Sequence, residues 1–179
     1  EGIATGIDEE WRTNMLPWCE ARITDFITDS SSRKAAYKLY EAGKAAEANR
    51  QPDKATALYR KGLELTNDAH LRETLAWVLS ESADCDALRA ALGERPAGAG
   101  PHHLEVACTR YGTDGRLAGA ERRAYLALVV RGLDAIADGN GDLAIEPLTT
   151  AAHQGGNAAL VAKRMDLLYD LRRCDEFLA

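Results

Sequence analysis

Apolar residues recur at helical spacing along almost the whole chain, and short polar clusters separate the apolar stretches. Recurrence every three to four residues predicts amphipathic α-helices, whereas strands would alternate residue by residue. Helix-starting residues stand at the breaks, such as Pro52 with Asp53 and Asp84 before Leu88. We therefore predict an all-α chain with roughly nine or ten helices of ordinary length.

Residues 1–30 are expected to form an N-terminal helical segment. Asp8 is placed to cap a helix, and Pro17 should kink or split it. The serine run 30–32 would then supply hydroxyls that cap a second helix, which extends to about Asn49. The expected core residues of the segment are Trp11, Met15, Trp18, Ile23, Phe26 and Ile27.

The hydrophobic pattern predicts two further features, a loop and an unusually apolar helix. The Gly- and Pro-rich stretch 93–101 is expected to be a flexible loop. The segment from Tyr125 to Ile136 is apolar nearly all round, so it either forms the centre of the fold or lines a groove. Of these two interpretations, a place in the core is favoured.

Composition narrows the function classes. The chain has 179 residues, enough for one domain, and carries 22 Lys+Arg against 28 Asp+Glu, a net charge of -6. No dense basic patch is present, so nucleic acid is not expected as a partner.

The longest apolar-rich stretch, Ala124 to Ala137, contains Arg131 and Asp134 and is shorter than the roughly 20 residues that span a bilayer. The chain starts at Glu1 without Met, so we expect that it is either processed or cut from something longer, and any signal peptide or anchor would already be gone.

Two windows of the sequence, 36–69 and 125–158, share a pattern of small and large residues. Gly43 and Gly132 stand at corresponding positions in them. A side chain at either position would push two paired helices apart, so glycine there indicates a closely packed helical hairpin. The first window also carries Leu39, Ala46, Ala55, Tyr59, Gly62, Leu63 and Leu65, and the second Leu128, Ala135, Gly139, Ala144, Leu148 and Ala151.

This pattern resembles the tetratricopeptide repeat, a unit of about 34 residues that forms two antiparallel helices. The windows depart from the family pattern at Ala46, at Asn67 and at Pro147. The resemblance implies that residues 1–179 form a single domain of antiparallel hairpins, stacked as a right-handed α-solenoid. Such an array has a concave surface suited to an extended peptide or a helix.

The resemblance also implies which residues meet a partner, because the first helix of each pair lines the groove in this family. We expect a non-enzymatic scaffold that holds a peptide or helix of another protein, for example during assembly of an envelope-associated complex. An alternative is a dedicated inhibitor or secretion chaperone that masks one effector protein, and self-association stays open. The implied partner-binding residues are Tyr37, Tyr40, Lys44, Glu47, Leu126, Val129, Leu133 and Ile136.

Candidate chemistry is sparse. His102, Glu105 and Cys108 would share one face if their segment is a helix, but their spacing matches no established metal motif. No phosphate loop or nucleophile motif is present. We therefore expect neither a cofactor nor a resident metal. A metal-dependent enzyme that uses His102, His103 and Glu105 is the least favoured alternative.

The four cysteines allow more than one interpretation, because they lack the CxxC spacing of zinc and redox sites. In a stacked array only neighbouring hairpins touch, which favours a Cys85–Cys108 bridge, whereas a Cys19–Cys174 bridge would require the two ends to meet. The pairing of Cys19 with Cys85 and of Cys108 with Cys174 stays open, as do free thiols. Any bridge would favour a periplasmic or secreted protein, with the cytoplasm as the alternative.

Overall fold

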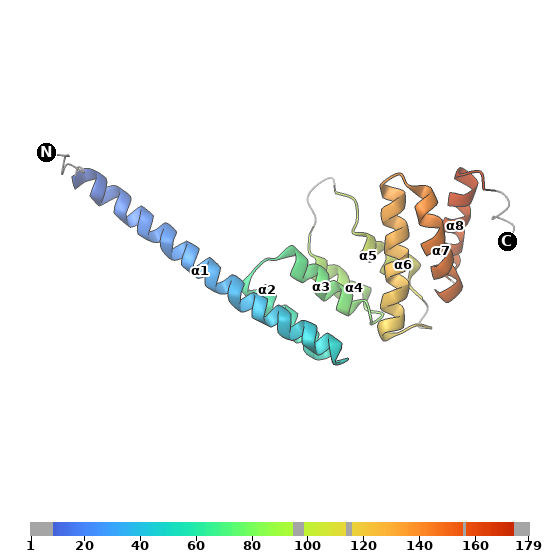
Figure 1. Ribbon diagram of the computed structural model, residues 1–179, viewed down its shortest axis with the longest axis horizontal. Coiled ribbons are helices and arrows are strands. Elements are labelled where there is room, and N and C mark those ends of the chain that lie inside the picture. Colours follow the sequence, from blue (N-terminus) through green and yellow to red (C-terminus); the bar gives the residue numbers. More distant parts are fainter. Residues whose placement is uncertain (1–8, 95–98, 114–115, 156, 174–179) are drawn as a thin grey trace.

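The computed structural model describes residues 9–94, 99–113, 116–155 and 157–173, and of residues 9–28 the backbone. These residues form eight helices and no strand, which confirms the all-α prediction. Figure 1 shows the helices following one another in chain order along the long axis of an elongated molecule. They are α1 (Glu9–Ala48), α2 (Pro52–Leu65), α3 (Ala69–Leu79), α4 (Cys85–Leu92), α5 (His103–Tyr111), α6 (Gly119–Ala137), α7 (Gly141–Gly155) and α8 (Ala158–Asp170).

The first helix is longer than predicted. Helix α1 runs without interruption through Pro17 and the serine run 30–32, so the predicted division of this segment into two helices is wrong. A proline removes one hydrogen bond from the ladder, and an interior serine costs less than about 1 kcal/mol of helix stability. An ion pair of 2.7 Å between Arg33 and Asp29 spans the serines on one face and favours the helix.

Other predictions for the N-terminal segment and the loops fall outside what the structure describes. The predicted cap Asp8 precedes the described residues, and 95–98 of the predicted loop 93–101 are not among them. The same holds for the side chains of the predicted core residues Trp11, Met15, Trp18, Ile23, Phe26 and Ile27.

Two helical hairpins contain the glycines singled out by the sequence. In the α1–α2 hairpin, a Cβ added at Gly43 would lie 2.3 Å from Cε1 of Tyr59. In the α6–α7 hairpin, a Cβ added at Gly132 would lie 2.5 Å from Cδ2 of Leu148. Both large side chains are fully buried and follow their glycine by the same interval in sequence. The prediction that these glycines permit close helix pairing is confirmed.

Aspartate side chains cap the N-termini of α3 and α4. The carboxylate of Asp68 accepts a hydrogen bond of 2.8 Å from the backbone N–H of Leu71 and so begins α3. Asp84 does the same for α4, where it accepts from the N–H of Ala87 at 2.9 Å. The cap at Asp84 confirms the helix start predicted from the sequence, and the two caps lie where the chain turns between α2, α3 and α4.

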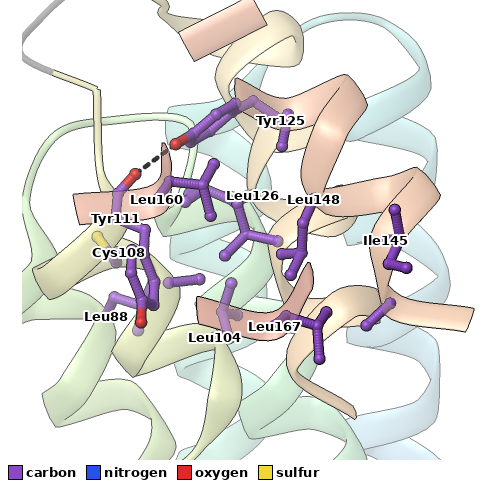
Figure 2. Close-up of a cluster of buried hydrophobic side chains, with 14 of the residues drawn as sticks. Leu88, Leu104, Cys108, Tyr111, Tyr125, Leu126, Ile145, Leu148, Leu160 and Leu167 are labelled. Atoms are coloured by element: carbon purple, nitrogen blue, oxygen red, sulfur yellow. Dashed lines mark hydrogen bonds between the residues drawn. The ribbon is translucent and has the colours of Figure 1, made fainter. Parts of the chain in front are cut away.

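The buried side chains form two clusters. The smaller cluster joins α1, α2 and α3 and consists of Ala46, Ala55, Tyr59, Leu71, Leu75 and Val78. The larger cluster extends from α3 to α8, and Figure 2 shows its leucines between the helices. There the hydroxyl of Tyr125 donates a hydrogen bond of 2.6 Å to the carbonyl oxygen of Tyr111 and ties α6 to α5.

Candidate functional site

A cleft of about 610 Å³ opens between α1 and the start of α3, and we call it the α1–α3 cleft. One wall belongs to α1 and the other to residues 66–71, which connect α2 to α3 and form the first turn of α3. Two of the predicted partner-binding residues, Tyr37 and Tyr40, therefore line one cleft. Its lining residues are Arg33, Ala36, Tyr37, Tyr40, Thr66, Asn67, Asp68, Ala69, His70 and Leu71.

Aromatic rings follow one another along this cleft. The ring centroids of Tyr37 and Tyr40 are 6.2 Å apart, and those of Tyr40 and His70 are 5.6 Å apart. Tyr40 also packs on the buried Tyr59, at 6.1 Å between centroids, which holds it on the surface of the first hairpin. Tyr37 is 62% exposed, and the negative charge of Glu41 and a hydrogen bond to it raise the Tyr37 pKa.

The polar groups of the cleft carry both signs of charge. The hydroxyl of Tyr40 lies 3.4 Å from Nε2 of His70 and bridges the two walls. Arg33 forms its ion pair with Asp29 at the α1 wall, and Asp68 lies on the opposite wall. Apolar rings with a few polar groups of mixed charge suit a peptide chain better than a strongly charged ligand.

Glu47 and Lys44, the other predicted partner-binding residues of the first window, do not line this cleft. Glu47 accepts a hydrogen bond from the Tyr59 hydroxyl and pairs with Arg123 at 2.6 Å, and Arg123 also reaches Glu81 at 3.2 Å. Burial opposes the ionised form of Glu47, but hydrogen bonds from Tyr59 and Arg123 outweigh it and lower the Glu47 pKa. Lys44 lies 3.5 Å from Glu47. Glu47 therefore joins the first hairpin to α6 and lies outside the α1–α3 cleft, and its contact with a partner stays a prediction.

The predicted partner-binding residues of the second window lie in or against the larger core cluster. Leu126 and Val129 have no exposed surface, and Leu133 and Ile136 are half-buried against the same cluster. Helices α5 and α7 pack on α6 and cover this face. For Leu126 and Val129 the predicted groove position is wrong, because a partner could reach them only if the helices separated.

The residues considered as metal ligands have different partners. His102 accepts a hydrogen bond of 3.1 Å from the backbone N–H of Leu104, Glu105 pairs with Arg89 at 2.6 Å, and Cys108 belongs to a disulfide. Within the described ranges, no group of three or more His, Cys, Asp or Glu side chains is placed to hold a metal ion.

One cysteine pairing predicted from the sequence is present. Cys85 and Cys108 form a disulfide with their Cα atoms 5.7 Å apart, which joins α4 to α5 and excludes the alternative pairing of each with a terminal cysteine. Cys174 and the side chain of Cys19 fall outside the described part of the chain.

Two residues of interest were missed by the sequence reasoning. His70 lines the α1–α3 cleft, and Arg122 lies beside the disulfide. The signal for His70 was its place just after the capping residue Asp68, at a hairpin junction. Arg122 gave a weaker signal, an arginine one turn before the apolar segment of α6.

Among the described residues, no helix combines the length and the hydropathy that crossing a bilayer requires. Comparison of the chain with protein-family models, with curated proteins and with solved structures finds no match.

Proposed function

We propose that this protein is a non-enzymatic scaffold that holds a peptide or a helix of a partner protein in the α1–α3 cleft. The observation that carries the proposal is the row of rings formed by Tyr37, Tyr40 and His70 beside a cleft of about 610 Å³. Tyrosine rings offer a large contact area and lose little conformational entropy on binding, since few torsions must be fixed.

The solenoid expected from the resemblance remains part of this proposal. The α1–α2 and α6–α7 hairpins bring a glycine against a large buried side chain at corresponding places. Most helices pack on the helix before and the helix after them in the chain. Both features support a tetratricopeptide-like array in which binding surfaces are repeated along one axis.

The disulfide supports a periplasmic or secreted site of action. Disulfides persist in oxidising compartments and are rare in the cytosol, where thiols are kept reduced. We propose on this ground that the scaffold works outside the cytoplasm, where it holds a partner during assembly of a larger complex.

The proposal is tested by capturing partners with the full chain. Two variants are compared, each of which removes an exposed tyrosine from a different face. Tyr37→Ala removes the outermost ring of the cleft, whereas Tyr169→Ala removes a 76% exposed tyrosine at the other end of the molecule. We expect the partner recovered with the wild type to be lost with Tyr37→Ala and retained with Tyr169→Ala. Calorimetry with the identified partner segment should give similar affinities for the wild type and Tyr169→Ala and a lower affinity for Tyr37→Ala.

Each result bears on the proposal. Equal capture by both variants, or loss with Tyr169→Ala alone, would overturn binding in the α1–α3 cleft. Recovery of a single tight partner would favour the dedicated inhibitor or chaperone, and recovery of several weaker ones would favour a general adaptor.

A further inference from the structure

A buried guanidinium contacts the disulfide. Arg122, which is 2% exposed, places Nη2 3.5 Å from Sγ of Cys108 and 3.9 Å from Sγ of Cys85. Its other hydrogen bonds fix this position, because Nε donates to the carbonyl oxygens of Ser80 at 3.0 Å and Ser82 at 2.9 Å. The charge is therefore held against the sulfurs by the backbone of a separate segment.

The two sulfurs differ in accessibility. Cys85 is the first residue of α4 and is half-buried, whereas Cys108 lies inside α5 and is 3% exposed. Cys85 is consequently the cysteine more open to attack by an external thiolate. The sulfur that would leave in such an attack is Cys108, which is the one closer to Arg122.

We propose that the Cys85–Cys108 disulfide is a redox-active site that exchanges reversibly with a dithiol reductant, with Arg122 as the group that stabilises the departing Cys108 thiolate. The reductant's thiolate attacks Sγ of Cys85, the Cys85–Cys108 bond breaks, and its electron pair stays on Cys108. The second thiol of the reductant loses its proton and attacks the mixed disulfide. Cys85 is released and protonated, and the reductant becomes a cyclic or paired disulfide. Two electrons pass from reductant to protein.

Arg122 favours this exchange for an electrostatic reason. A leaving thiolate departs faster when its negative charge is stabilised, and a nearby guanidinium donates charge-assisted hydrogen bonds to it. The donor already points at the sulfur, so no reorganisation is needed. Burial lowers the Arg122 pKa, which reflects the cost of enclosing a cation, and a thiolate beside it would reduce that cost.

Other charged groups surround the sulfurs. On α4, Asp84 caps the helix and Asp86 pairs with the exposed Arg89, which also pairs with Glu105 of α5. The hydroxyl of Thr113 accepts a hydrogen bond of 3.2 Å from Nη1 of Arg122. Cys85 stands at the N-terminus of α4, where the helix dipole also favours a thiolate, so the preference for negative charge on Cys108 depends on the closer contact of Arg122 with its sulfur.

The experiment measures the rate at which dithiothreitol reduces the oxidised full chain, in a background with Cys19→Ser and Cys174→Ser. Thiols are trapped with a maleimide at successive times. We expect Arg122→Met to slow reduction by about tenfold or more, because Cys108 then leaves without a cationic partner. Arg123→Met is the matched control: it removes a neighbouring arginine that pairs with carboxylates instead of sulfurs, and it should keep the wild-type rate.

A second readout does not depend on any arginine variant. The ultraviolet absorbance of the thiolate is followed against pH in the reduced chain, once folded and once unfolded in urea. We expect a thiolate to form at lower pH in the folded chain. Ionisation at the same pH in both states would overturn the proposal even if Arg122→Met fails to fold.

The remaining outcomes are also decisive. A wild-type reduction rate in folded Arg122→Met, or an equal slowing in Arg123→Met, would contradict the role of Arg122.

Discussion

The α1–α2 and α6–α7 hairpins are built alike and are used differently. In each, a glycine on the first helix meets a large buried side chain on the second, Tyr59 in one case and Leu148 in the other. Yet the outer face of the first helix remains open around Tyr37, which is 62% exposed, whereas Leu126 on the corresponding helix has no exposed surface. Pairing within a hairpin therefore does not decide which faces remain available for binding.

Neighbouring helices account for the difference. Helix α6 is flanked by α5 on one side and α7 on the other, and Tyr125 ties it to the end of α5. Among the described helices α1 packs chiefly on α2, as Figure 1 shows. A helix with one main packing neighbour thus keeps a face that a helix between two neighbours must bury.

The largest expected change in the free energy of unfolding is at the buried face of α6. Leu126→Ala should lower the free energy of unfolding by about 2–5 kcal/mol, because it leaves a cavity in the larger cluster. Leu133 is on the same helix but half-buried, so Leu133→Ala should lower the free energy of unfolding clearly less. Urea unfolding followed by circular dichroism measures both. A neutral Leu126→Ala would mean that this face is not packed as described.

Substitution of the two hairpin glycines tests whether both hairpins depend on the same close helix packing. Gly43→Ala and Gly132→Ala should each destabilise the protein by about 1–3 kcal/mol, through overpacking against Tyr59 and Leu148. Helix propensity alone would favour alanine, so the sign of the change is informative. Gly100→Ala, where an added Cβ meets nothing within 4 Å, is the control for thermal unfolding and should be near neutral.

Much of this likeness could be predicted from the sequence, because it depends on local pattern. The glycine positions, the caps at Asp68 and Asp84 and the breaks between helices are all encoded within a few residues. The environments of Glu47 and Arg122 could not be predicted in this way. Each depends on contacts between helices far apart in the chain, as in the pair of Glu47 with Arg123.

A smaller effect concerns the link between the first hairpin and α6. The Glu47 pKa is lowered in the folded state, so its stabilisation is fully present above the ordinary value of 4.5 and is lost as pH falls through the lower folded value. Denaturant unfolding at a series of pH values should show wild type losing about 1–2 kcal/mol more than Glu47→Gln over this acidic range. Parallel curves for the two proteins would show that the pair with Arg123 does not stabilise the fold.

The smallest effect is expected at the open faces. Tyr37→Ala and Leu143→Ala remove side chains that are 62% and 67% exposed, one from each hairpin. Each should change the free energy of unfolding by less than about 0.5 kcal/mol. A larger loss for Tyr37→Ala by urea titration would mean that its ring supports the fold, and a loss of binding in that variant would then need another explanation.

Site-specific photocrosslinking would locate a partner protein in the α1–α3 cleft. A benzophenone amino acid is placed at position 37 or, as the similarly exposed control, at position 143, and each full chain is irradiated with its partner. We expect a crosslinked complex from position 37 and none from position 143. Crosslinking from position 143 alone, or equally from both, would contradict binding in that cleft.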